Sequence, residues 1–151
     1  MTKRNYGGNS DVGAIEIYSS DSSYKLYGSN GKSSDLAFSK YQFASDDVIG
    51  DNVCMSGRNS GNVCGKIVSR NLSFKQNDVL FTNIRSATFS GMPGDSGAPV
   101  FNQQSDDSAH ERTIYGLFKG DITYSDGHSE RIYSQVQYIF SDLNINQIIV
   151  N

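Results

Sequence analysis

The segment Gly91–Val100, GMPGDSGAPV, contains the residue types that a nucleophilic serine requires. Such a serine needs an exposed hydroxyl at a sharp turn, with backbone N–H groups aimed at the oxyanion that develops during attack on a carbonyl. Gly94 and Gly97 permit backbone conformations that a β-carbon would block. We therefore predict that Ser96 attacks, that the N–H groups of Gly94 and Ser96 form an oxyanion hole, and that Asp95 anchors the turn. An ordinary turn between two strands is the alternative.

A serine hydroxyl also needs a base, and histidine is scarce in this chain. The two histidines, His110 and His128, both follow Ser96. His110 lies in a polar segment separated from Ser96 by a strand of about five residues, roughly 17 Å long at the usual rise. We expect His110 to lie far from Ser96. His128 follows in a later loop, where it either contacts substrate side chains or is a solvated loop residue.

The two cysteines, Cys54 and Cys64, flank the polar segment MSGRNSGNV, which is typical of a hairpin tip. Two strands joined by that tip would place the cysteines opposite each other. A disulfide there would stabilise the fold by roughly 2–3 kcal/mol and would favour an oxidising, extracellular setting. Two separate buried thiols are the alternative. A metal site is disfavoured, because no histidine or second cysteine pair is near in sequence.

The elements that must position these residues are predicted to be short strands and one helix. Aromatic and β-branched residues recur in short runs between Gly, Ser, Asn and Asp, which predicts an all-β chain. The helical spacing of apolar residues between Val136 and Leu143 predicts a short helix. So many short strands favour a Greek-key barrel or a sandwich. Strands are expected at 14–18, 24–27, 36–43, 52–57, 62–70, 79–84, 97–102, 112–119, 130–134 and 147–150.

Several segments together resemble the chymotrypsin-like serine proteases, particularly the bacterial branch with the streptogrisins and α-lytic protease. GMPGDSGAPV is similar to the family's nucleophile loop. The segment VCMSGRNSGNVCGKI, residues 53–67, is similar to the disulfide hairpin of that branch, and IYGLFKG, residues 114–120, to the strand that lines the substrate cleft. The C-terminal helix also fits, and the resemblance covers nearly the whole chain from about residue 5.

This resemblance implies an all-β, chymotrypsin-like Greek-key β-barrel with a short C-terminal helix. The chain would hold the second barrel of the family and the last strand region of the first. Residues 1–45 would end the N-terminal barrel and form the inter-barrel connection, and residues 46–151 would form the C-terminal barrel. The resemblance also supports the disulfide Cys54–Cys64 and a secreted protein, although the first residues contain no apolar stretch of signal-peptide length.

In the segment YGGNSDVGAIEI, residues 6–17, Asp11 matches the catalytic aspartate of the family. That aspartate holds the catalytic histidine in its tautomer and stabilises the imidazolium. A turn or capping aspartate is the alternative. The family orders its triad His, Asp, Ser, and no histidine precedes Ser96. The resemblance therefore implies that the histidine, with most of the N-terminal barrel, is missing from this chain.

The resemblance also places substrate-binding residues. Phe118, Lys119, Gly120 and Asp121 would line the cleft, and Ser90 would form the floor of the primary specificity pocket. A neutral floor predicts apolar or aromatic side chains in preference to Arg or Lys. Lys119 departs from the family, which usually has there a serine that supports the catalytic aspartate, and its ammonium can pair with Asp11 and compete with the histidine. Asp121 replaces a small residue that normally lets the substrate backbone approach.

The resulting functional hypothesis is a serine endopeptidase that works through an acyl-enzyme, with little turnover in this chain alone. The alternatives are a non-catalytic homologue that binds a protein or peptide in the cleft, a split enzyme, and a carbohydrate-binding or adhesive β-domain. Expected partners are peptide or protein substrates and the missing N-terminal barrel. The net charge of −3 disfavours nucleic acid. No apolar run approaches the roughly 18 residues that cross a membrane, and neither a cofactor nor a metal is implied.

Overall fold

The computed structural model of the 151-residue chain describes residues 2–18, 20, 22–23, 25–27, 33–103 and 111–145. His110 and the strand expected at 147–150 lie outside these residues. The described elements are almost all strands, as the sequence predicts. They are β1 (Thr2–Gly7), β2 (Ser10–Ile15), β3 (Lys25–Tyr27), β4 (Ser33–Tyr41), a 3₁₀ helix (Ala44–Asp46), β5 (Asn52–Gly57), β6 (Gly61–Gln76), β7 (Val79–Ala87), β8 (Pro99–Asn102), β9 (Glu111–Thr123), β10 (Ser129–Gln135) and the helix α1 (Val136–Leu143).

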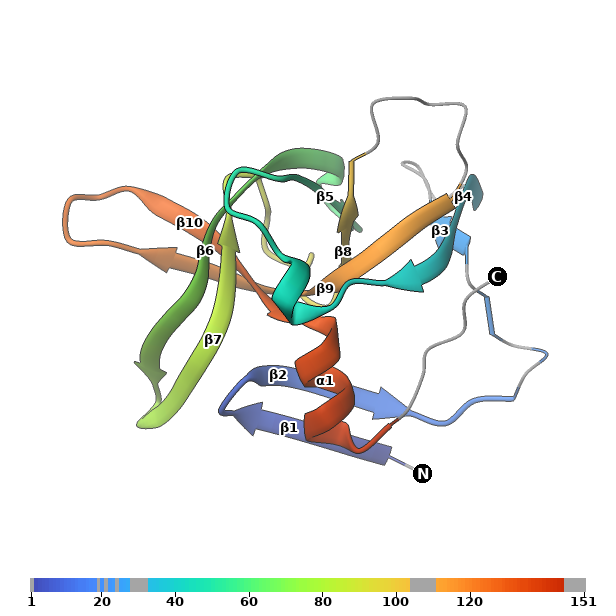
Figure 1. Ribbon diagram of the computed structural model, residues 1–151, viewed down its shortest axis with the longest axis horizontal. Helices are drawn as coiled ribbons and strands as arrows, with labels where there is room; N and C mark the ends of the chain where they lie inside the picture. The colour runs from blue at the N-terminus through green and yellow to red at the C-terminus, as the bar shows by residue number, and fades with distance from the viewer. Residues whose placement is uncertain are drawn as a thin grey trace.

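A closed barrel makes up the larger part of the molecule (Figure 1). Its strands follow the order β5, β6, β7, β10, β9 and β8, and the pairing of β8 with β5 closes the ring. All of these pairs are antiparallel. Outside the ring, β4 runs parallel to β9, and β3 pairs with β4. The predicted all-β barrel is therefore confirmed.

Local sequence explains why the longest hairpin of the barrel turns where it does. Gln76 pairs with Val79, so Asn77 and Asp78 form a two-residue turn between β6 and β7. Both turn residues have positive φ, 53° and 62°. Two-residue hairpin turns of this kind favour Asn and Asp, whose short polar side chains tolerate the left-handed conformation.

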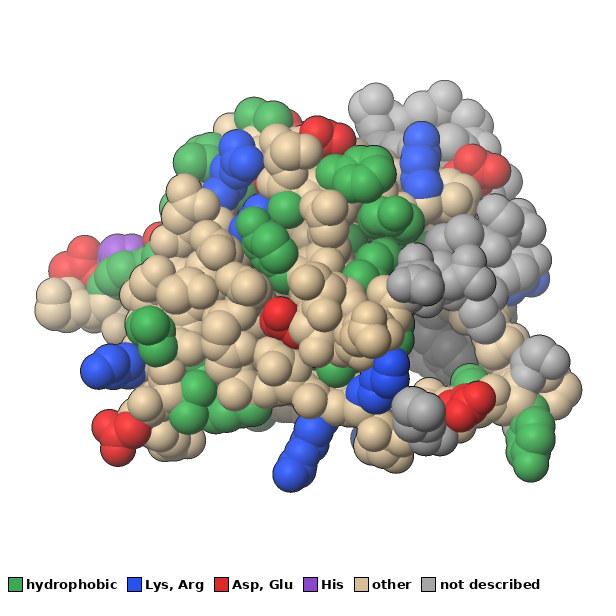
Figure 2. All heavy atoms as spheres, turned by 60° about the horizontal axis from the view of Figure 1, so that its bottom comes forward, with side chains coloured by type: hydrophobic (Ala, Val, Ile, Leu, Met, Phe, Trp, Pro, Cys, Tyr) green, Lys and Arg blue, Asp and Glu red, His purple; other side chains and the backbone are tan. Residues whose placement is uncertain are grey.

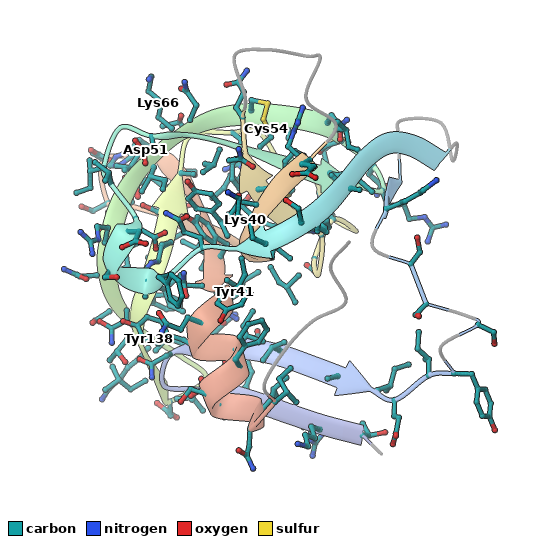
Figure 3. The ribbon with its side chains drawn as sticks, turned by 45° about the vertical axis from the view of Figure 1, so that its right-hand side comes forward. Lys40, Tyr41, Asp51, Cys54, Lys66 and Tyr138 are labelled. Carbon is teal, nitrogen blue, oxygen red and sulfur yellow. A yellow bond between two sulfur atoms is a disulfide. The ribbon has the colours of Figure 1, made fainter. Side chains whose placement is uncertain are left out.

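The core has an inner part and a part under the helix. The barrel interior is filled by buried side chains from its own strands and from the loop before β8. The helix α1 packs its apolar face on the outside of the barrel, where Tyr41 at the end of β4 lies against Phe140 with ring centroids 5.0 Å apart (Figure 3). The interior cluster comprises Val53, Met55, Ile67, Ala87, Phe89, Ala98, Val100, Tyr115, Phe118 and Tyr133.

A separate two-stranded sheet, β1 and β2, runs beneath α1 in Figure 1. Val12 of β2 packs on Ile139 and Leu143 of the helix. Gly8, in the turn between the strands, is bridged to Phe81 of β7, which connects this hairpin to the barrel. The β1–β2 sheet therefore packs directly on both the helix α1 and the barrel.

The N-terminal region departs from the expected elements. The strand expected at 14–18 is instead β2, which begins at Ser10 and ends at Ile15, and β1 was not anticipated. The residues of β1 alternate only between exposed and partly exposed positions. The strand therefore has little of the apolar periodicity by which a strand is predicted from sequence. The division of the chain into units at residue 45 stays a prediction.

Candidate active site

Ser96 lies exposed on a turn whose C-terminal end is hydrogen-bonded to β9. The N–H of Gly97 donates to Phe118 O at 2.8 Å, and the N–H of Phe118 donates to Ala98 O at 2.8 Å. The Ser96 hydroxyl itself donates to Lys119 O at 3.3 Å. Gly94 and Gly97 have φ of 98° and 88°, a conformation that other residues rarely adopt. Both glycines therefore adopt the positive φ that their places in the predicted turn required.

A buried carboxylate anchors this turn. Asp95 is 1% exposed, and it accepts hydrogen bonds from the N–H groups of Asn59 (2.7 Å), Ser60 (3.2 Å) and Met92 (2.9 Å) and from Ser60 Oγ (2.5 Å). Burial opposes ionisation of Asp95, but the hydrogen bonds from Ser60 Oγ, Met92, Asn59 and the Ser60 N–H outweigh it and lower the pKa of this carboxyl below its ordinary value. The hairpin tip between β5 and β6 thus binds an ionised Asp95.

A second contact from the same hairpin tip fixes the orientation of the Pro93–Gly94 peptide, which precedes Asp95 and Ser96. Asn59 Nδ2 donates to Pro93 O at 2.6 Å. Because a trans peptide is planar, the Pro93 carbonyl and the Gly94 N–H point in opposite directions. The Gly94 N–H therefore points away from Asn59. Within the described part of the chain, neither the Gly94 N–H nor the Ser96 N–H has a hydrogen-bond acceptor.

Asp11 and Ser96 both contact Lys119. The ammonium of Lys119 lies 2.5 Å from Asp11 Oδ2, while its carbonyl accepts from the Ser96 hydroxyl. Asp11 is further held because its N–H donates to Ser134 Oγ at 3.0 Å. The two side chains that the sequence assigns to catalysis therefore contact the same residue at different points, Asp11 at the Lys119 ammonium and Ser96 at the Lys119 carbonyl.

The Lys119 ammonium is well enclosed at this position. Its side chain is 7% exposed, and Nζ lies 4.5 Å from the centroid of Phe81 and 5.3 Å from that of Tyr6. Aromatic faces attract a cation electrostatically. Lys119 is thus placed as a counter-ion of Asp11, as its position in the sequence suggested.

The described histidine lies elsewhere. His128 sits near the tip of the β9–β10 hairpin, which projects from the barrel in Figure 1. Its Nδ1 lies 2.5 Å from Asp126 Oδ1, and its ring stacks on Tyr124 with centroids 4.3 Å apart. The hydrogen bond to Asp126 is the main cause that raises the pKa of His128 above its ordinary value. In residues 2–103 and 111–145, where described, no histidine contacts Ser96 or Asp11.

The residues expected to line the cleft are contiguous in β9 but differ in exposure. Phe118 is buried, Lys119 and Gly120 are half-buried, and Asp121 is exposed. Ser90, expected at the floor of the specificity pocket, is also exposed, so its side chain is not enclosed. A cavity of about 280 Å³ adjoins this part of β9, lined by Phe74, Lys75, Gln76, Lys119, Gly120, Asp121, Ile122, Thr123 and Ile132.

Sequence reasoning missed Arg131 and Asn59. Arg131 pairs with Asp121 across the β9–β10 hairpin, and its Nε lies 3.2 Å from Asp121 Oδ1. Counting outward from the Ser125-Asp126-Gly127 turn would have placed these two residues opposite each other. Asn59 reaches the serine loop across 34 positions of sequence, and no local pattern signals that contact.

The disulfide Cys54–Cys64 is present, and the two cysteines are direct partners in the β5–β6 ladder (Figure 3). Among the described residues, no cluster of three His, Cys, Asp or Glu side chains could hold a metal ion. None of the described helices is both long and apolar enough to span a membrane. On the face drawn in Figure 2, the charged side chains of both signs are scattered and form no single basic patch.

Three solved bacterial proteases share this fold. Thermobifida fusca Protease A is 21% identical, covers 97% of this chain and 72% of its own, and has a TM-score of 0.72. Cellulomonas bogoriensis chymotrypsin is 19% identical and has a TM-score of 0.63, and the match covers 83% of this chain and 62% of that protein. The Nocardiopsis protease is 21% identical and has a TM-score of 0.60, and the match covers 81% of this chain and 58% of that protein.

These similarities show that the chain has the chymotrypsin-like fold over most of its length, which confirms the resemblance seen in the sequence. The chain spans between 58% and 72% of the length of these three structures. No family model matches the chain, and no curated protein matches it significantly.

Proposed function

We propose that this chain provides the nucleophile and the cleft of a serine endopeptidase that acts through an acyl-enzyme. The observation that supports the proposal is the Pro93–Gly97 loop, in which the exposed Ser96 adjoins two N–H groups without an acceptor in the described part of the chain. A peptide carbonyl oxygen placed against the N–H groups of Gly94 and Ser96 would receive two hydrogen bonds as its negative charge develops.

In this reaction Ser96 Oγ attacks the carbonyl carbon of the scissile bond while a base takes the hydroxyl proton. The C–N bond then breaks, and the leaving amine takes that proton from the protonated base. Water, activated by the same base, attacks the acyl ester, releases the acid and restores the Ser96 hydroxyl. The base is an imidazole supplied from outside the described residues, and Asp11 would orient it once Lys119 no longer occupies the carboxylate.

A second candidate function is a non-catalytic homologue that binds a protein or peptide in the same cleft. It is favoured by the contact between Lys119 Nζ and Asp11 Oδ2, because this ion pair occupies the carboxylate that a catalytic histidine would need. The shielding of the ammonium by Phe81 and Tyr6 makes the pair a stable feature of the described structure.

We also propose an extracellular or otherwise oxidising setting for the protein. The disulfide Cys54–Cys64 supports it, since such bonds persist mainly where the glutathione and thioredoxin systems do not reduce them.

Labelling with a fluorophosphonate tests the proposed chemistry. In the reaction the Ser96 oxygen forms a bond to phosphorus and fluoride leaves, which intact mass spectrometry detects as one adduct. We expect one adduct on Ser96 in the complete natural polypeptide and none in the Ser96→Ala variant. The 151 residues by themselves should label roughly a thousandfold more slowly, because no histidine among the described residues contacts Ser96.

The same measurement separates the two candidate functions. A complete natural polypeptide that is folded and binds peptides, yet forms no adduct, would exclude the endopeptidase and favour the binding homologue. Labelling that persists in the Ser96→Ala variant would show that another residue is the nucleophile.

A further inference from the structure

The four residues before Ser96 form a β-turn that has two accessible states. The N–H of Asp95 donates to Met92 O at 3.1 Å, which closes the turn over Pro93 and Gly94. Proline at the second position has a negative φ, so the φ of 98° at Gly94 in the third position identifies a type II turn. A type I turn accepts the same proline and requires a negative φ at the third position, which glycine also adopts.

The two turn types differ in the direction of their central peptide, which here joins Pro93 and Gly94. Conversion of one type into the other rotates this peptide by roughly 180° and leaves the flanking residues in place. In the observed type II state the Pro93 carbonyl faces Asn59, and the Gly94 N–H points away from it. In the type I state the two groups exchange directions, so that a carbonyl oxygen would point where the proposed oxyanion needs a donor.

Asn59 contacts the group that distinguishes the two states. Its Nδ2 donates to Pro93 O at 2.6 Å, and its backbone N–H donates to Asp95 Oδ1 at 2.7 Å. A β-carbon on Gly94 would lie 2.5 Å from Asn59 Nδ2, so this side chain packs closely against the turn. An amide has both a donor and an acceptor, and here it presents the donor. The hydrogen bond therefore stabilises the type II state, in which a carbonyl faces the amide.

We propose that Asn59 is a positioning residue that holds the Pro93–Gly94 peptide in the type II state and so keeps the Gly94 N–H available to an oxyanion. The inference rests on the proposed function, because the oxyanion belongs to that reaction. Asn59 acts only through the Gly94 N–H. When its side-chain donor is lost, more molecules adopt the type I state, and fewer have a complete oxyanion hole.

The isosteric substitution Asn59→Asp tests the direction of this hydrogen bond. The introduced carboxylate accepts and does not donate, so it repels the Pro93 carbonyl and would accept the Gly94 N–H of the type I state. Asn59→Ala removes the donor without adding an acceptor. Both variants retain the backbone N–H that binds Asp95. Arg58→Gln is the matched control, because it makes the same change of net charge as Asn59→Asp at the neighbouring exposed residue of the hairpin tip.

NMR of the 151-residue chain measures the state of the turn without requiring turnover. The Pro93 Hα and the Gly94 amide proton lie closer together in a type II turn than in a type I turn, because the ψ of the second residue differs. We expect a strong nuclear Overhauser effect between these protons in the wild type and in Arg58→Gln. It should be weaker in Asn59→Ala and weakest in Asn59→Asp, while the remaining spectrum shows that each variant is folded. An equally strong effect in Asn59→Asp would overturn the proposal.

Turnover of a chromogenic peptide by the complete natural polypeptide measures the effect on catalysis. We expect kcat to fall about tenfold in Asn59→Ala and about a hundredfold in Asn59→Asp, with KM nearly unchanged, because the oxyanion forms only along the reaction path. Arg58→Gln should retain the kcat of the wild type. A higher KM at constant kcat in both Asn59 variants would overturn the proposal, because it would indicate a contact with bound substrate.

The two measurements separate this inference from the proposed function. A natural polypeptide that turns over no peptide, yet shows the expected order of Overhauser effects, would count against the endopeptidase and support the role of Asn59 in the turn. Turnover that Asn59→Asp leaves unchanged would support the endopeptidase and overturn the role of Asn59.

Discussion

The side chain of Asp95 fixes the serine turn to the tip of the β5–β6 hairpin. Its carboxylate is enclosed by the hairpin tip, and a β-carbon placed on Gly57 would lie 2.5 Å from its Oδ1. Gly57 is therefore needed where the backbone approaches Asp95 closely. A buried carboxylate is stable only when hydrogen bonds replace its water, and Asn59, Ser60 and Met92 provide them here.

The pKa of Asp95 leads to a prediction on stability against pH. Because this pKa is lowered, the ionised carboxylate stabilises the fold above the ordinary value of 3.8, and that contribution is lost as the pH falls through the lower folded value. Urea unfolding should show the free energy of unfolding falling more steeply below about pH 4 in the wild type than in Asp95→Asn. At pH 7 the variant should lose about 1–3 kcal/mol.

Asp46→Asn is a matched control, since Asp46 is an exposed carboxylate near the barrel. At pH 7 it should lose less of the free energy of unfolding than Asp95→Asn, because the carboxylate that it removes is exposed and not buried. Parallel slopes for the wild type and Asp95→Asn would show that Asp95 is not bound as an anion.

Among the elements, the β5–β6 hairpin has the most direct effect on the site. Cys54 and Cys64 join its strands in register, and its tip provides Asn59 and Ser60. These residues bind Asp95 and the Pro93 carbonyl, so the hairpin fixes the peptides before Ser96 although it lies far from them in sequence. The hairpin thus orients the Gly94 N–H from a distant part of the sequence.

Removal of the disulfide tests this element. The variant Cys54→Ala with Cys64→Ala should lose about 2–3 kcal/mol of the free energy of unfolding, because its unfolded chain is no longer cross-linked. Urea unfolding with and without a reductant measures the loss. The reductant should destabilise the wild type and leave the double variant unchanged. A double variant as stable as the oxidised wild type would contradict this role.

At the scale of the whole molecule, the β1–β2 sheet leaves apolar groups uncovered. Ile15, Ile17 and Tyr18 are 70%, 53% and 82% exposed. They lie together at the end of β2 and just beyond it, on a two-stranded sheet that is separate from the barrel. Exposed apolar side chains beside strand edges promote association with other chains.

We therefore expect the isolated chain to self-associate through this region. Analytical ultracentrifugation over a range of concentrations should show weaker association for Ile17→Ser with Tyr18→Ser than for the wild type. Because both side chains are exposed, the free energy of unfolding should change by no more than about 0.5 kcal/mol. Ile49→Ser, which removes an exposed apolar side chain from the turn before β5, should leave association unchanged. An equal effect of the two variants would disprove the assignment to this region.

The sequence by itself determined the features that depend on neighbouring residues. The GMPGDSGAPV segment predicted a turn that exposes Ser96, and Gly94 and Gly97 have the positive φ that this required. The polar tip between Cys54 and Cys64 predicted the hairpin and the disulfide, and the apolar spacing after Gln135 predicted α1. In each case the deciding interaction is local, so a short pattern of residues contains it.

Only the tertiary structure decided which distant residues meet. Lys119 and Asp11 are 108 positions apart, and Asn59 and Asp95 are 36 apart. Arg131 lies beside Gly91 because β10 lies between β7 and β9 in the closed ring. Such contacts depend on strand order, register and barrel closure, and the alternation of side chains along one strand carries no information about the strands that will adjoin it.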